Sequence, residues 1–124
     1  MNKILIVDDE QDVCTVLKKV LEQDEFEADY FDDPLSALEN FKPNLYDLLI
    51  LDIKMPEMDG FKLYKAMKKI DSKVKVCFLT GSEMYDEEIR KGEVLDALDK
   101  DLFLQKPIRN EELINEIKRL VNSK

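Results

Sequence analysis

The sequence Ile4-Leu5-Ile6-Val7-Asp8-Asp9 joins a short apolar run, without polar alternation, to a pair of carboxylates. We predict a strand over residues 3–7 and two more of the same character over residues 47–51 and 74–79. Continuous apolar runs of this length are typical of strands buried on both faces of a parallel sheet. An edge strand is expected around residues 26–30, where apolar and acidic residues alternate, and a short strand over residues 102–104.

Helical patterns separate the predicted strands. Apolar residues recur with helical spacing over residues 13–21, 61–70 and 113–121, and Asp33-Pro34 predicts a capped helix start followed by a stripe at Leu35, Leu38 and Phe41. Residues 82–99 have a helical composition interrupted by Gly92. No repeat or linker divides the chain, so we expect one α/β domain over residues 1–124, with a doubly wound parallel sheet and helices on both faces.

The composition excludes several classes of protein. Lys and Arg number 19 against 28 Asp and Glu, and the net charge of −9 argues against binding to nucleic-acid phosphates or to an anionic membrane surface. The absence of His excludes Ser-His and Cys-His nucleophiles and His-ligated zinc. The first apolar run is too short for a signal peptide or a membrane span, so we expect a cytoplasmic protein that uses carboxylates, hydroxyls, lysines or a bound cation.

Chemically useful side chains follow four of the predicted strands. Asp8 and Asp9 follow the first, and Asp52, Thr80 and Lys106 follow the third, fourth and fifth. The carboxyl ends of parallel strands share one edge of a sheet, where ligands bind in open α/β folds. Clustered carboxylates repel one another, and Mg²⁺ relieves the repulsion while leaving room for a phosphate oxygen. A hydroxyl and a lysine beside an aspartate nucleophile would complete a phosphoryl-transfer site.

Each of these residues also has a simpler interpretation. The Asp8-Asp9 pair could cap the following helix, Asp52 could be an ordinary turn residue, Thr80 could begin a loop, and Lys106 could be a solvated lysine. Four unrelated turns would then carry, by coincidence, the residue types that a phosphoryl site needs at one edge. The joint placement therefore favours the functional interpretation.

Four motifs also resemble response-regulator receiver domains of two-component signalling. They are Ile4-Leu5-Ile6-Val7-Asp8-Asp9-Glu10, the stretch Leu49-Ile50-Leu51-Asp52-Ile53-Lys54-Met55-Pro56-Glu57-Met58-Asp59-Gly60, Leu79-Thr80-Gly81, and Phe103-Leu104-Gln105-Lys106-Pro107. The resemblance spans the chain in the family's order. It implies a flavodoxin-like five-stranded sheet in the order 2-1-3-4-5 with five helices, and a phosphoacceptor that assists its own phosphorylation and dephosphorylation without being an enzyme.

The resemblance assigns a role to each matching residue. Asp52 would accept a phosphoryl group from a sensor histidine kinase or a phosphotransfer protein. Mg²⁺ would be held by Asp8, Asp9, Asp52 and the backbone carbonyl of Lys54. Thr80 and Lys106 would bind the phosphoryl group, Thr80 and Phe103 would switch conformation, and the bond before Pro107 would be cis.

The resemblance also implies a signalling output. A face formed by residues 82–99, the fifth strand and the last helix would change on phosphorylation and act on a downstream protein target or output domain, with a phosphorylation-dependent homodimer as one outcome. The interval from Thr80 to Lys106 is longer than usual in the family. Only Asn122-Ser123-Lys124 follow the last predicted helix, so we expect either a stand-alone regulator or a fragment of a longer one.

Two alternatives come from other functional classes. A Mg²⁺-dependent aspartyl-phosphate phosphatase would have a similar site, but such enzymes commonly carry a second Asp two residues after the nucleophile, where this chain has Lys54. A nucleotide- or flavin-binding module would need a glycine-rich loop after the first strand, where this chain has Asp8-Asp9.

Overall fold

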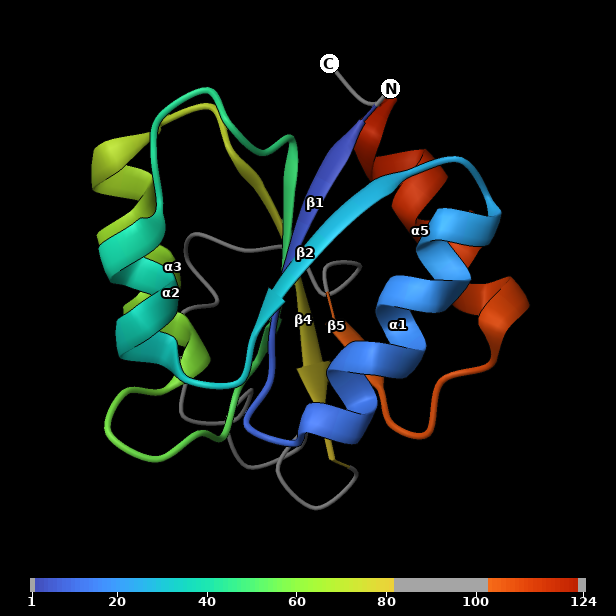
Figure 1. Ribbon diagram of the computed structural model, residues 1–124, viewed down its shortest axis with the longest axis horizontal. Helices are drawn as coiled ribbons and strands as arrows, with labels where there is room; N and C mark the ends of the chain where they lie inside the picture. The colour runs from blue at the N-terminus through green and yellow to red at the C-terminus, as the bar shows by residue number, and fades with distance from the viewer. Residues whose placement is uncertain (1, 82–102, 123–124) are drawn as a thin grey trace.

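The computed structural model describes residues 2–81 and 103–122. Strands β1 (Lys3–Val7), β2 (Glu27–Phe31), β3 (Leu48–Asp52), β4 (Lys75–Thr80) and β5 (Phe103–Gln105) form one parallel sheet in the order β2-β1-β3-β4-β5. Figure 1 shows α1 (Gln11–Gln23) and α5 (Asn110–Val121) on one face of this sheet, and α2 (Pro34–Asn40) and α3 (Gly60–Ile70) on the other. The predicted sheet type and strand order are confirmed, and the helix predicted over residues 82–99 lies outside the described residues.

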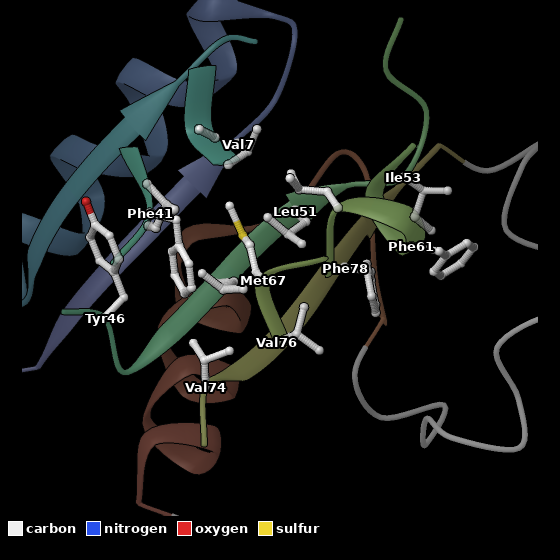
Figure 2. Close-up of a cluster of buried hydrophobic side chains, with 14 of the residues drawn as sticks. Val7, Phe41, Tyr46, Leu51, Ile53, Phe61, Met67, Val74, Val76 and Phe78 are labelled. Carbon is white, nitrogen blue, oxygen red and sulfur yellow. The ribbon is translucent and has the colours of Figure 1, made fainter. Parts of the chain in front are cut away.

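The two hydrophobic cores follow from the alternation of side chains along each strand. Leu5, Val7 and Leu51 point to the α2–α3 face, whereas Ile4 and Ile6 point to the α1–α5 face. Figure 2 shows the first core, in which Phe61 of α3 packs edge-on against Phe78 of β4 at a centroid distance of 4.9 Å. Burial on both sides explains why the central strands are continuously apolar.

Some predicted details differ from the structure. Strands β2, β3, β4 and β5 each begin and end one residue later than predicted. The predicted stripe of the first helix, over residues 13–21, included Val16, but that side chain is 56% exposed, whereas the small residue Cys14 beside the stripe is buried. The helix therefore turns a slightly different face to the sheet, which brings the Cys14 thiol within 3.2 Å of the Asp8 carbonyl oxygen. Leu35 and Ile70 of the predicted stripes are also largely exposed.

The parallel register brings the carboxyl ends of four strands to one edge. Val7 pairs with Leu51, Asp52 pairs with Leu79, and Thr80 pairs with Gln105. The residues that follow β1 and β5 are thereby placed beside the last residues of β3 and β4. Among the helices in the described ranges, none has both the length and the apolar character needed to cross a membrane.

Candidate functional site

Three charged side chains from three strand ends meet at the carboxyl edge of the sheet. The Lys106 ammonium lies 2.8 Å from Asp8 Oδ2 and 3.6 Å from Asp52 Oδ1. Asp8 is fully buried, Asp52 is 5% exposed, and Lys106 is partly exposed. One lysine thus bridges two buried carboxylates that lie 44 positions apart in the chain.

The two oxygens of Asp8 have different environments. Oδ1 accepts a hydrogen bond from the backbone N–H of Glu10 at 2.9 Å, which fixes the carboxylate at the turn between β1 and α1. Oδ2 is within ion-pair distance of Lys106 but receives no hydrogen bond of acceptable geometry from any described residue. Asp8 Oδ1 thus binds the N–H of Glu10, the N-cap residue, rather than a free N–H of the first turn of α1, and its buried Oδ2 faces the Lys106 ammonium.

Asp9 and Glu10 extend the acidic cluster toward solvent. Carboxylate oxygens of Asp8, Asp9 and Glu10 lie within 4.8 Å of one another, and the last two side chains are exposed. Asp9 is also within hydrogen-bonding reach of Asp52. Glu10 is the N-cap residue of α1, yet its side chain makes no capping bond, and its Oε1 lies 3.5 Å from the Lys106 ammonium.

The electrostatics of the site raise the pKa values of its two buried carboxyl groups, Asp8 and Asp52. Burial is the largest cause that raises the pKa of Asp52 to about 7, and the Asp8 charge adds to it while Lys106 opposes it. Burial also raises the pKa of Asp8, against the opposing effects of Lys106 and the Glu10 N–H group. For Lys106, burial alone would lower the pKa, but the surrounding carboxylates raise it. The ammonium therefore stays charged and relieves only part of the repulsion.

Close backbone contacts shape the loop after Asp52. Gly60 N–H donates to the Ile53 carbonyl at 2.8 Å, and a Cβ atom at position 60 would lie 2.4 Å from the Asp52 carbonyl oxygen. Glu57 has a φ of 73°, and the Met58 N–H donates to the Pro56 carbonyl at 2.8 Å, which closes a tight γ-turn. Lys54 lies in this loop with an exposed side chain. Only glycine at position 60 lets α3 begin directly against the end of β3.

The remaining predicted residues lie on the neighbouring strands. Thr80 ends β4, is 1% exposed, and its hydroxyl donates to the Gly81 carbonyl at 3.1 Å. The Lys106 N–H donates to the Thr80 carbonyl at 2.8 Å, and the Lys106–Pro107 peptide bond is cis. Phe103 is buried and stacks on Phe78 at a centroid distance of 5.4 Å, so in this structure it points into the α2–α3 core.

The donor set of the site fits a hard divalent cation. Its ligands would be carboxylate oxygens, which Mg²⁺ prefers to nitrogen or sulfur. The strongest structural indication is the buried Asp8 Oδ2 beside the exposed Asp9 carboxylate: Oδ2 receives no hydrogen bond from the residues that the structure describes and lies 2.8 Å from the Lys106 ammonium. A cation there would also lower the raised pKa values of Asp8 and Asp52, because nearby positive charge stabilises the ionised form.

Two residues at this site were part of the quoted motifs but had no predicted role. Glu10 contacts Lys106, and Gly60 supports the backbone of Asp52. A third carboxylate directly after Asp8-Asp9 was a visible signal for Glu10. The contact of Gly60 with Asp52 depends on the path of the loop between them, which the sequence did not reveal.

The fold and site define a class of protein: a flavodoxin-like α/β domain with a carboxylate-lysine cluster at the carboxyl edge of its sheet. Residues 4–118 match the family model described as "Response regulator receiver domain". The chain belongs to the response-regulator receiver family.

Individual relatives agree with this assignment. The chain is 33% identical over 121 residues to the response regulator receiver protein CpdR of Brucella abortus, covering 98% of each chain. It is 32% identical to the transcriptional regulatory protein PrrA of Mycobacterium leprae over 96% of this chain but 49% of that protein, so the chain spans about half the length of some curated relatives. The non-phosphorylated HemR receiver domain from Leptospira biflexa has a similar structure, with a TM-score of 0.82 and 27% identity, covering 100% of this chain and 97% of that one.

Proposed function

We propose that the chain is a phosphoacceptor in two-component signalling and that Asp52 receives the phosphoryl group from a sensor histidine kinase or a phosphotransfer protein. The observation that carries this proposal is the position of Asp52, a buried carboxylate 3.6 Å from the Lys106 ammonium and beside Asp8 and Asp9. A carboxylate with a neighbouring cation is suited to attack phosphorus, and lysine is suited to hold a phosphoryl oxygen.

The transfer step follows from this arrangement. An Asp52 carboxylate oxygen attacks the phosphorus, a P–O bond forms, and the P–N bond to the donor imidazole breaks, leaving the electron pair on the imidazole nitrogen. Lys106 holds a phosphoryl oxygen as negative charge spreads over the transferring group. Mg²⁺, held by Asp8, Asp9, Asp52 and the Lys54 carbonyl, would supply charge neutralisation for the same group.

Thr80 is the proposed link to the rest of the molecule. Its hydroxyl is engaged with Gly81, so a new phosphoryl oxygen on Asp52 would compete for this donor and draw the β4 end toward the site. Phe103 on the adjacent strand would repack with it. The output face proposed for residues 82–99, β5 and α5 falls partly on residues outside the described ranges, and a downstream protein or a second copy of the chain is its proposed partner.

An apolar groove beside the site offers a surface for the donor protein. It lies between α1 and the segment after β5, and its lining includes Val13, Val16, Leu17, Pro107 and Ile108 next to Lys106. Val16 is 56% exposed and therefore adds apolar surface to this groove. A donor helix seated there would approach the carboxyl edge from the side on which Glu10 and Lys106 lie.

Phosphorylation with a small acyl phosphate tests the proposal without the unknown kinase. The intact chain with Mg²⁺ and acetyl phosphate should gain one phosphoryl group by mass spectrometry, and Asp52→Asn should gain none. Asp47→Asn is a matched control, because Asp47 precedes β3 at the opposite edge of the sheet.

Three results would contradict the proposal. Labelling that persists in Asp52→Asn would exclude Asp52 as the acceptor. Labelling that is insensitive to chelation would exclude the metal requirement. Repeated turnover of a phosphate monoester would favour the phosphatase. Beryllofluoride, a phosphoryl mimic, should change the elution volume or the spectrum if the output switch and the dimer are correct.

A further inference from the structure

Helix α3 carries an exposed basic face on a chain that is otherwise strongly acidic. Four of its eleven residues are lysine, none is acidic, and Lys73 follows in the next loop. Lys62, Lys65 and Lys69 have the spacing i, i+3, i+7, which places them in one stripe along the helix. All of these lysines are exposed, whereas the whole chain has a net charge of −9.

Intramolecular ion pairs do not account for this face. Within residues 2–81 and 103–122, the ion pairs involve Lys3, Lys18, Lys106, Lys118 and Arg119, and none involves a lysine of the α3 stripe. The two acidic residues that flank the helix are used by the backbone. Asp59 caps it by accepting from the Lys62 N–H at 2.8 Å, and the buried Asp71 accepts from the Asn44 N–H at 2.9 Å.

Helix stability does not explain the stripe either. Lysine pairs at i, i+3 and i, i+4, such as Lys62 with Lys65 and Lys65 with Lys69, repel each other and weaken a helix. A lysine in the first turn, as at position 62, is also unfavourable with the helix dipole, although Lys68 and Lys69 in the last turn are favourable. A chain that tolerates an avoidable loss of stability at one surface is expected to use that surface.

The face also offers some apolar contact area. Ile70, at the end of the helix and to one side of the stripe, is 41% exposed. Tyr64 is turned away from the stripe and packs edge-on against Phe78 of β4 at a centroid distance of 5.8 Å, so it adds nothing to this face. Interfaces between proteins combine such contacts with charged groups at their rim. The rise of an α-helix sets the distance from Lys62 to Lys69 at about 10 Å, or two turns.

We infer that the outer face of α3 is a docking surface for an acidic helical segment of a partner protein. Charge complementarity carries the choice of occupant: the stripe would match glutamates spaced i, i+3, i+7 on a partner helix. A nucleic-acid duplex fits less well, because its charge continues well beyond two helical turns. A bound duplex would extend past the stripe toward the acidic carboxyl edge, where Glu57 and Asp59 lie beside the start of α3 and would repel its phosphates. The surface is separate from the phosphoacceptor site and does not depend on the proposed phosphorylation.

The test uses a fluorescein-labelled helical peptide of about 20 residues with glutamates at i, i+3 and i+7, long enough to be helical in water. Fluorescence anisotropy should detect binding to the intact chain at low salt, weakening as salt is added. The triple variant Lys62→Gln/Lys65→Gln/Lys69→Gln should bind about fivefold to tenfold more weakly. Asp52→Asn should bind as tightly as the wild type.

A charge-matched control separates the stripe from net charge. The variant Lys19→Gln/Lys42→Gln/Lys118→Gln removes three exposed lysines from other parts of the surface and should change affinity by less than about twofold. The melting temperature of the stripe variant should equal or exceed that of the wild type, since repulsion is removed. If the triple variant fails to fold, Lys65→Gln alone should still fold and weaken binding.

Several outcomes would overturn the inference. One is that the acidic peptide does not bind at all, and another is that the control variant loses as much affinity as the stripe variant. A peptide with glutamine in place of glutamate could bind equally well. Tighter stripe-dependent binding of duplex DNA or of phosphatidylserine vesicles would identify a polyanion or membrane surface instead.

Discussion

Aspartates occur at both edges of the sheet, and the two edges use them differently. At the amino edge, the buried Asp71 accepts hydrogen bonds from the backbone N–H groups of Asn44 and Lys73, and Asp47 accepts from the N–H of Lys3. These carboxylates join the loops that precede β1, β3 and β4. At the carboxyl edge, Asp8 Oδ2 lacks a hydrogen bond from the described residues, and Asp52 is 3.6 Å from the Lys106 ammonium.

The difference separates carboxylates that accept backbone hydrogen bonds from carboxylates that crowd together at the candidate site. A buried charge stabilises a fold when backbone donors satisfy it, as at Asp71, and destabilises the fold when carboxylates crowd together. Burial is the largest cause of the raised pKa values of Asp8 and Asp52, and the charges of neighbouring carboxylates add to it. A cation bound at the carboxyl edge would therefore stabilise the folded chain, whereas a cation at the amino edge would not.

Substitution of Gly60 should have the largest effect on the carboxyl edge. A Cβ atom there would lie 2.4 Å from the Asp52 carbonyl oxygen, so Gly60→Ala must displace the loop or the helix start. We expect a loss of about 3 kcal/mol in the free energy of unfolding, measured with urea, together with slower acetyl phosphate labelling. Gly81→Ala is the control, because a Cβ atom at position 81 would meet nothing within 4 Å. Equal effects of the two substitutions would contradict the close approach.

At the amino edge, Asp71→Ala should lower the free energy of unfolding somewhat less than Gly60→Ala does. It leaves the N–H groups of Asn44 and Lys73 without their acceptor, and we expect a loss of about 2 kcal/mol in a urea titration. Asp71→Asn retains one acceptor oxygen and should lose less. Labelling by acetyl phosphate should continue in both variants, and its loss in folded Asp71→Asn would mean that the two edges are not independent.

Asp52→Asn should act in the opposite direction and stabilise the fold near neutral pH. The folded-state pKa of Asp52, about 7, lies above its ordinary value of 3.8, so between these values the folded chain holds a proton that the unfolded chain has lost. The free energy of unfolding of the wild type should therefore fall as pH rises through this window. Since one pKa unit corresponds to about 1.4 kcal/mol and neighbouring charges relax, we expect a gain of about 2 kcal/mol at pH 8 in chelator.

Urea titrations at several pH values would check this sign. The Asp52→Asn curve should be flatter between about pH 4 and pH 7 than that of the wild type, and the two should converge at the acid end. Asp12→Asn, an exposed carboxylate on α1, should leave the shape unchanged. If the wild type instead becomes more stable as pH rises through this window, the pKa of Asp52 is not raised in the folded state.

Relief of backbone strain should give the smallest effect. Glu25 near the amino edge and Glu57 near the carboxyl edge have φ values of 70° and 73°, in the left-handed region that glycine adopts more easily. Replacing either with glycine should stabilise the fold by up to about 1 kcal/mol. Only Glu57→Gly, in the loop after Asp52, should alter the rate of acetyl phosphate labelling. A labelling rate that changes equally in Glu25→Gly would show that the two edges do not differ in their effect on the candidate site.

Much of the site was predictable because chain order and strand parallelism suffice to place it. Asp8, Asp52, Thr80 and Lys106 each follow an apolar run, and parallel strands bring their carboxyl ends together without any knowledge of packing. The exposure of Val16 was not predictable in this way. It depends on the rotation of α1 against the sheet, which the apolar residues on two sides of the helix do not fix.

The sequence by itself determined the parallel sheet, the two-sided burial of the central strands and the set of charged residues at one edge, because these depend on hydrophobic pattern and connectivity. The strand order was expected only from the resemblance to receiver domains, and the structure confirms it. Only the tertiary structure decided that Lys106 is shared among Asp8, Asp52 and Glu10. It also decided that Gly60 lies against the Asp52 backbone and that the Asp71 side chain joins two loops. These features depend on distances of a few Å between segments remote in the chain, and such distances are set by packing rather than by local pattern.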